Sequence, residues 1–414
     1  MPYVLTLKNT QMSRRKTYAL KYKDLFDWVG ILALFILSAE GGVDYIFAGT
    51  PLVIWKQLIV FVLTTVIFFR IYKYKIGSVL YLSLFIASIL VLSSSILGMG
   101  LVSSLKNAFY YISWVPFYYF GLTINRNIAK RVLYSVPYYL IVISGLGLFV
   151  QMQTHLLDFL NNTLDAYLYR SEFREAHRLS FLYVTSTIVM PTLIGFLTLL
   201  LLFSQRMIRK VVALFFLSIS AIMTGSLSGA IMLAGAFGIV GVRIRKLSTF
   251  VSIFLALFFG YFLYLNIGLI SPSLEENVNI QMDRIASNGL SSQSNQGRLW
   301  QWETAISIIS EFSPLEFATG KGLGITNGGA SGHARLIHGE SSYFQAMIEG
   351  GMLGLFLRIF PFILLITSSP RRSYLETLVY AAFLFVATAV APIFGAYGVQ
   401  CILGFLAGYQ RRDD

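Results

Sequence analysis

The longest polar interruption in this apolar chain lies between Asn295 and Gly354, and it contains the residue types that could do chemistry. Arg298 stands at the edge of one apolar element, and His338 stands shortly before another. A charge in such a position is costly and tends to have a function. A helix that begins just after His338 would present free N–H groups, which favour anions. The region therefore predicts an anion-binding site, and an interfacial histidine with satisfied hydrogen bonds is the alternative.

The elements that must position these residues are predicted from composition. Hydrophobic residues make up 56% of the 414 residues and charged residues only 12%, whereas about a quarter of a soluble domain is charged. A chain of this balance cannot bury its apolar side chains in a soluble core, so we expect an all-α polytopic membrane protein. Its one cysteine, Cys401, excludes a disulfide within the chain.

Hydropathy predicts about twelve transmembrane helices. The segments are approximately 25–39, 51–69, 76–97, 108–124, 132–151, 181–203, 211–223, 228–242, 250–270, 343–367, 375–391 and 396–410. The segment 211–242 could instead form one long helix, which would invert the topology after it. The charge pattern favours two short spans.

The net charge of +13 is distributed as expected for a membrane protein and does not indicate nucleic-acid binding. Basic clusters precede the first span or follow even-numbered spans, and they hold most of the Lys and Arg residues. The positive-inside rule therefore places the N and C termini in the cytoplasm. We expect a single integral membrane domain over 1–414, with a smaller periplasmic loop at 152–180 and a large one at 271–342.

A few cations fall in these predicted outer loops, where the rule disfavours them. They are Arg170, Arg174, Arg178, Arg284, Arg298, Lys321 and Arg335. Most could pair with neighbouring acids on a solvated surface. Arg178 and Arg298 differ because each abuts a predicted hydrophobic element.

The large loop contains one predicted amphipathic helix, over 298–312. Leu299, Trp302, Ile306 and Ile309 recur at helical spacing, which is typical of an interfacial helix. The glycine-rich segment 320–324 lacks the order of a phosphate loop, so we interpret it as a tight turn and a flexible lid.

Before the tenth predicted span, Ser342 and Gln345 fit a capping box, so a helix should begin near Ser342. His333 and His338 do not have zinc-site spacing, and we expect no metal and no cofactor. Glu349 lies about two turns into the span and would need a partner. The Gly350-x-x-x-Gly354 spacing predicts close approach of a neighbouring helix.

Two groups of residues resemble the O-antigen polymerase and O-antigen ligase superfamily. The first is Arg178-Leu179-Ser180-Phe181. The second is Gly297-Arg298-Leu299, then Gly322-Leu323-Gly324, then His338 and the run from Glu349 to Gly354. The family often has an arginine after span seven, where this chain has Leu227. Its ligases usually follow their histidine with asparagine, whereas Gly339 follows His338 here, which favours a polymerase.

The resemblance implies glycosyl transfer from a polyprenyl-pyrophosphate-linked oligosaccharide to an acceptor sugar hydroxyl, at the outer face of the bacterial inner membrane. Arg178 and Arg298 would stabilise the leaving pyrophosphate, because arginine binds phosphate bidentately. His338 would be the base for the acceptor hydroxyl. A single displacement, without nucleotide or metal, would invert the anomeric centre. The expected substrate-binding residues are Arg174, Lys321, Arg335, Glu340, Tyr343 and Trp302, and the expected partners are the donor, the acceptor, membrane lipids and a chain-length regulator.

Three alternatives remain open. An O-antigen ligase would join finished polysaccharide to lipid A core. A lipid-linked oligosaccharide flippase should show two similar halves and ionisable residues at mid-membrane, but only Lys56, Glu349 and Arg358 fall clearly within predicted spans. A peptidoglycan polymerase would use an acidic residue in the large loop, where Asp283 is the only aspartate.

Overall fold

The computed structural model describes residues 27–38, 54–74, 77–152, 227–242, 293–327, 341–371, 373–390 and 397–411, with isolated positions between 211 and 279. Within these ranges the chain forms helices joined by turns, and no described residue belongs to a strand. The all-α prediction is therefore confirmed for this part of the chain. The predicted spans 181–203, 211–223 and 250–270 lie largely outside the described residues.

The helices follow the predicted apolar segments closely. Glycine, serine or charged residues flank the long apolar runs, and the helices end near these residues. After a first helix, Asp27–Ser38, the described elements are α3 (Trp55–Tyr74), α4 (Ser78–Ile96), α5 (Leu101–Ile112), α6 (Trp114–Thr123), α7 (Arg126–Met152), α12 (Leu227–Val242), α15 (Gln293–Ser310), α16 (Pro314–Thr319), η2 (Ile325–Asn327), α17 (Ser342–Thr367), α18 (Tyr374–Val390) and α19 (Tyr397–Arg411). Two of them, α4 and α17, are long and apolar enough to cross a membrane.

The segment 108–124, predicted as one span, is two helices. Helix α5 ends at Ile112 and α6 begins at Trp114, with Ser113 between them. The Ser113 hydroxyl donates a 2.8 Å hydrogen bond to the side-chain carbonyl of Gln400 in α19. The split allows α5 to contact α4 and α17 while α6 packs along α19.

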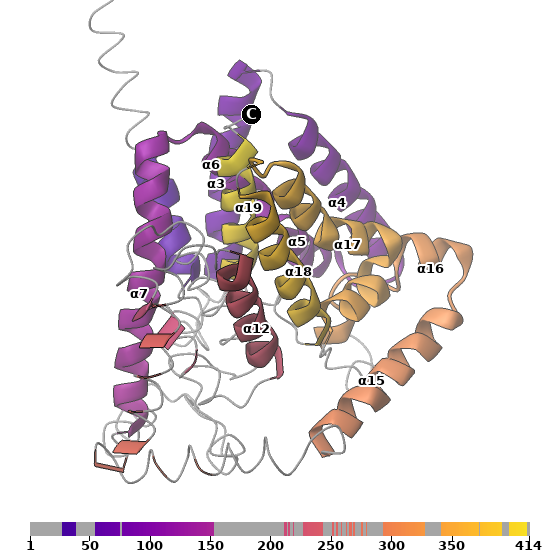
Figure 1. Cartoon of the computed structure of the whole chain (residues 1–414). Helices are drawn as coiled ribbons and strands as arrows, with labels where there is room; N and C mark the ends of the chain where they lie inside the picture. Colours follow the sequence, from indigo (N-terminus) through magenta and orange to yellow (C-terminus); the bar gives the residue numbers. More distant parts are fainter. Residues whose placement is uncertain are drawn as a thin grey trace, which may run out of the picture.

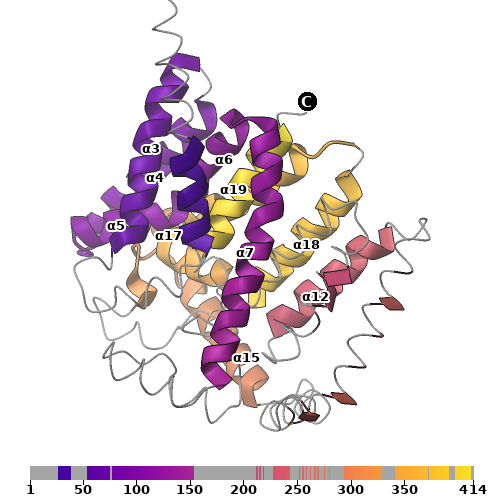
Figure 2. The ribbon, with the colours of Figure 1, turned by 90° about the vertical axis from the view of Figure 1, so that its left-hand side faces the viewer.

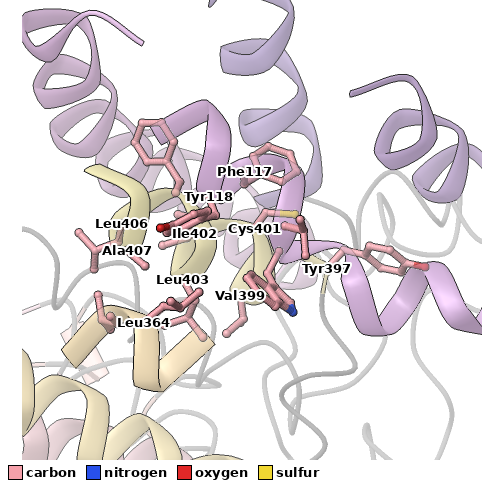
Figure 3. Close-up of a cluster of buried hydrophobic side chains, with 14 of the residues drawn as sticks. Phe117, Tyr118, Leu364, Tyr397, Val399, Cys401, Ile402, Leu403, Leu406 and Ala407 are labelled. Carbon is pink, nitrogen blue, oxygen red and sulfur yellow. The ribbon is translucent and has the colours of Figure 1, made fainter. Parts of the chain in front are cut away.

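Helix α19 is the centre of the bundle. It lies beside α6 and near α17 in both ribbon views (Figures 1 and 2), and all its residues from Tyr397 to Gln410 are buried. Figure 3 shows Tyr118 of α6 and Leu364 of α17 near its Leu403 and Leu406, and Phe117 of α6 nearer to its Cys401. A helix that is enclosed on all sides must be apolar on all sides, as this one largely is.

Glycines bring the backbones of α6 and α19 into contact. A Cβ added at Gly404 would lie 2.1 Å from the carbonyl oxygen of Trp114, and one at Gly408 would lie 1.8 Å from that of Tyr118. This Gly-x-x-x-Gly pair therefore makes the kind of close approach expected of Gly350 and Gly354. Gly350 instead meets the side chain of Leu90, at 3.5 Å.

Candidate functional site

Helix α17 is broken near its first third. Gly351 has φ 56° and ψ −153°, which separates a short segment, 342–350, from a longer one, 352–367. Glycine adopts this conformation readily because it has no Cβ. A Cβ at Gly351 would also lie 2.5 Å from the backbone of Ala318 in α16. The break therefore places the backbone of α17 directly against the end of α16.

The segment 320–324 fills the break. Its three glycines, Gly320, Gly322 and Gly324, have positive φ values of 73°, 119° and 85°. The Lys321 N–H donates to the carbonyl of Ile348 at 2.8 Å, and the Gly322 N–H donates to that of Glu349 at 3.2 Å. These bonds satisfy carbonyls that the interrupted helix cannot pair within itself.

The same segment is attached to α4 and α5. The Leu323 N–H donates to the hydroxyl of Ser94 at 2.8 Å, and the Asn107 amide donates to the Leu323 carbonyl at 3.4 Å. The Leu323 side chain is fully buried. The predicted tight turn is present, but it is docked on three helices, so the interpretation as a flexible lid is wrong.

A buried carboxylate, Glu349, lies next to this turn with only 1% of its surface exposed. The Tyr111 hydroxyl donates to one of its oxygens at 2.8 Å. The Thr326 hydroxyl and the Gln345 amide, the latter at 3.2 Å, donate to the other. The partner that a charge at this position needs is therefore supplied by α5, by η2 and by the preceding turn of α17.

Arg358 extends this cluster beyond the break. It is 2% exposed, and its guanidinium carbon lies 4.5 Å from the ring centroid of Tyr110 and 4.3 Å from that of Tyr111. These are cation–π distances. Tyr111 therefore presents its hydroxyl to a carboxylate and its ring face to a guanidinium.

Helix α15 packs against the first segment of α17. Ala305 of α15 and Ile348 of α17 are buried together, with Ile309 and Phe312 packed around them. The predicted helix is confirmed, although it begins at Gln293. Of the predicted apolar stripe, Ile309 packs beside the buried pair, whereas Leu299 is 54% exposed and Ile306 is 56% exposed.

Of the predicted site residues, Trp302, Lys321 and Tyr343 are described. The Trp302 ring lies 6.1 Å from that of Phe344, at the contact of α15 and α17. The Lys321 ammonium lies 5.6 Å from the ring centroid of Phe312. These two residues are on the α15–α16 side of α17.

Tyr343 belongs to another side of α17. Its hydroxyl donates to the carbonyl of Phe385 at 3.0 Å and accepts a hydrogen bond from Thr388. Its ring lies 4.7 Å from that of Phe385. The structure therefore gives Tyr343 a packing contact with α18 and does not bring it together with Trp302.

The other predicted site residues fall largely outside the described part of the chain. These are Arg174, Arg178, Arg335, His338 and Glu340. Arg298 lies in the second turn of α15, not at its start, and its side chain is outside the described residues. Helix α17 begins at Ser342 as expected, but its cap is Ser341, whose hydroxyl accepts from the Phe344 N–H. The predicted capping box is wrong, since Gln345 binds Thr326 and Glu349 instead.

One exposed carboxyl near the turn is electrostatically perturbed. Ser313 caps α16, and its backbone N–H donates to Glu316 at 2.8 Å while its hydroxyl accepts from the Glu316 N–H. The backbone hydrogen bond from Ser313 holds the pKa of the Glu316 carboxyl below its usual value. This capping box fixes the start of the helix that leads into segment 320–324.

Two sequence comparisons assign this chain to no family. A scan against protein-family models finds no match, and a search of curated proteins finds no similar sequence. The described residues contain no group of three or more His, Cys, Asp or Glu that could hold a metal ion. The arrangement itself is a buried, hydrogen-bonded carboxylate beside a broken helix, suited to fixing the surrounding backbone.

The residues that sequence reasoning missed are Tyr111, Thr326 and Gln345. One signal was available, because Gln345 and Glu349 are four residues apart and so share a helix face. Tyr111 carried none, since it lies in an aromatic apolar run far away in the sequence.

Proposed function

We propose that this protein is a repeat-unit polymerase of a bacterial surface polysaccharide, such as O-antigen or capsule. It transfers glycan from polyprenyl pyrophosphate to an acceptor sugar hydroxyl, at the outer face of the inner membrane. The full chain is a multi-pass protein of about twelve spans. The observation that supports this proposal best is the pair of backbone hydrogen bonds from segment 320–324 to α17 at the break near Gly351. These bonds attach the large polar loop to the helix that His338 precedes.

A broken helix suits a membrane enzyme. Irregular backbone at membrane depth is tolerated where it is buried in protein or lines a cavity, and membrane proteins use such interruptions at their sites. Thr326, just before residues 328–340, and Gln345, in the first turn of α17 after them, both bind Glu349. Residues 328–340, which include His338, therefore connect two segments that share one buried anchor.

The reaction is a single displacement. The acceptor hydroxyl oxygen forms a bond to the anomeric carbon of the donor, and the bond from that carbon to the pyrophosphate oxygen breaks. The hydroxyl proton passes to His338, and the lipid pyrophosphate leaves with its charge stabilised by Arg178 and Arg298. Arg174, Lys321, Arg335 and Glu340 are proposed to bind substrate.

The exposed aromatic surface of α15 is proposed to contact sugar. Trp300 is 52% exposed, whereas the half-buried Trp302, two residues later and on another side of the helix, packs near Phe344 of α17. An amphipathic ring with an exposed face is well suited to stacking. Tyr343 packs on α18, and we propose that it holds the start of α17 in position and does not contact sugar.

Alanine substitutions at His338, Arg298 and Arg178 test the proposal in cells that need this gene for polymer. Loss of a general base typically lowers a rate by about 10²–10⁴-fold, so His338→Ala should leave almost no polymer at normal protein level. His333→Ala is the matched control in the same loop and should leave polymer unchanged. Normal polymer length and yield in both His338→Ala and Arg298→Ala would refute the mechanism.

Deletion of the gene distinguishes a polymerase from a ligase. Loss of a polymerase leaves single repeats on the lipid A core, whereas loss of a ligase leaves polymer on its lipid carrier. We expect the first result, because glycine, and not asparagine, follows His338.

A further inference from the structure

An apolar groove runs between α4 and α5, with a volume of about 340 Å³. Its walls include Leu84, Ala87 and Val91 of α4 and Leu105, Ala108 and Ile112 of α5. The one polar side chain in its lining, Ser88, donates its hydroxyl to the carbonyl of Leu84 at 2.8 Å. The groove therefore offers hydrocarbon surface and no unsatisfied donor to whatever occupies it.

Helix α5 separates this groove from the candidate site. Ala108 and Ile112 line the groove, whereas their neighbours Asn107 and Tyr111 reach segment 320–324 and Glu349. The groove is therefore one helix away from the buried cluster.

The corner between α4 and α5 also touches the turn. A Cβ at Gly322 would lie 2.8 Å from the side chain of Met99, which precedes α5. This corner follows the groove residue Leu92 in the chain and precedes the groove residue Leu105, so it connects the groove to segment 320–324.

A cationic residue adjoins the groove lining in the chain. Lys106 is exposed, and it follows the groove residue Leu105 and precedes Asn107. The groove lining contains no carboxylate. An apolar groove with a lysine next to its lining is complementary to a hydrocarbon chain that carries a phosphate.

We propose that this groove holds the isoprenoid chain of the lipid-linked donor, with Lys106 beside its phosphate. This inference rests on the proposed function, which requires a polyprenyl pyrophosphate at the candidate site. The methyl-branched chain then lies along α4 and α5, and its phosphate end is presented toward segment 320–324.

Photocrosslinking of the purified full chain in lipid nanodiscs tests this directly, without catalysis. The probe is a polyprenyl phosphate with a diazirine near the phosphate end. We expect crosslinks in peptides that contain Leu84 to Ile112, which excess unlabelled polyprenyl phosphate removes and excess phosphatidylglycerol does not. Equal competition by phosphatidylglycerol would mean that the groove is ordinary lipid-facing surface, and the proposal would be wrong.

Two leucine substitutions sharpen the test. Leu105→Trp fills the groove from a position that is 43% exposed, and Leu82→Trp adds the same bulk at a position of α4 that is 42% exposed and outside the lining. Leu105→Trp should reduce crosslinking about tenfold, which corresponds to ~1.4 kcal/mol of binding, and Leu82→Trp should leave it unchanged. Equal crosslinking in the two variants would overturn the proposal.

The outcome separates the groove from the proposed reaction. If His338→Ala leaves polymer intact while the crosslink and its loss in Leu105→Trp persist, the polymerase proposal fails and the isoprenoid site stands. If His338→Ala abolishes polymer but the crosslink maps elsewhere, the polymerase proposal stands and the groove proposal fails.

Discussion

The hydroxyl of Tyr111 donates a 2.8 Å hydrogen bond to the carboxylate of Glu349, across 238 positions of the sequence. It joins α5 to α17 just before the break at Gly351. Because Glu349 is almost fully buried, its hydrogen bonds replace those that water would make. The pair therefore fixes the position of the broken helix relative to α5 and to the turn that α5 also contacts.

Removal of the carboxylate should destabilise the protein. Glu349→Ala leaves the buried donors of Tyr111, Thr326 and Gln345 without their shared acceptor, and each buried donor that loses its acceptor typically costs about 1–3 kcal/mol. Thermal unfolding of the detergent-solubilised protein measures the loss. Glu349→Gln keeps an acceptor and should be clearly more stable than Glu349→Ala. An unchanged melting temperature for Glu349→Ala would show that the cluster does not stabilise the fold.

The two contacts of Tyr111 can be separated by substitution. Tyr111→Phe removes the hydrogen bond to Glu349 but keeps the ring that faces Arg358, so it should cost about 1.5–3 kcal/mol, as expected for a hydrogen bond to a charged group. Tyr374→Phe, at an exposed position, is the control and should change nothing.

A double-mutant cycle then tests the coupling. If Tyr111→Phe costs as much in the Glu349→Gln background as in the wild type, the two residues are energetically independent. We expect a smaller cost in that background, because the charge that strengthens the bond is absent.

Most helix positions could be predicted because they depend on local apolar runs. Helices α4, α17, α18 and α19 begin and end within two residues of the predicted segments. The turn at 320–324 was also predictable, because closely spaced glycines favour the positive φ values that a tight turn needs. These features need no knowledge of what lies nearby in space.

The features that the sequence did not predict depend on contacts between residues far apart in the chain. At Gly351 the backbone of Ala318 leaves no room for a Cβ, and one hydrogen-bond partner of Glu349 comes from α5, far away in the sequence. The cap at Ser341 and the expected cap at Ser342 are neighbouring serines, and only the extended backbone of Ser341, with φ −122° and ψ 120°, distinguishes them. The Gly350 and Gly354 spacing was interpreted as a packing motif, although the glycine between them, Gly351, is the one that breaks the helix.

Alanine at Gly351 should damage the site specifically. Its φ of 56° disfavours any side chain, at a cost of about 1–3 kcal/mol, and its Cβ would collide with the backbone of Ala318. We expect a lower melting temperature and little polymer. Gly241→Ala is the matched control, because a Cβ there meets nothing within 4 Å in helix α12, and it should be neutral or stabilising by up to about 1 kcal/mol. Equal behaviour of the two variants would show that the break is not required.

The cap of α16 should make the entry to segment 320–324 sensitive to acid. Because the pKa of Glu316 is lowered in the folded protein, its contribution is present above the unfolded pKa and is lost as pH falls through the folded pKa. Backbone amide exchange measures this, after correction for the intrinsic rate. Protection of the Phe317 and Gly320 amides, which donate to the carbonyls of Ser313 and Glu316, should fall as the pH drops below the usual pKa of a glutamate.

Two variants of this cap show which group is responsible. Ser313→Ala removes the side-chain cap and should reduce protection of the same amides at neutral pH, in keeping with a cap contribution of about 1 kcal/mol. Glu316→Gln should abolish the pH dependence, whereas Glu303→Gln, on the exposed side of α15, should keep it. If the pH dependence survives in Glu316→Gln, another group causes it, and the hydrogen bond from Ser313 to Glu316 does not make this segment sensitive to acid.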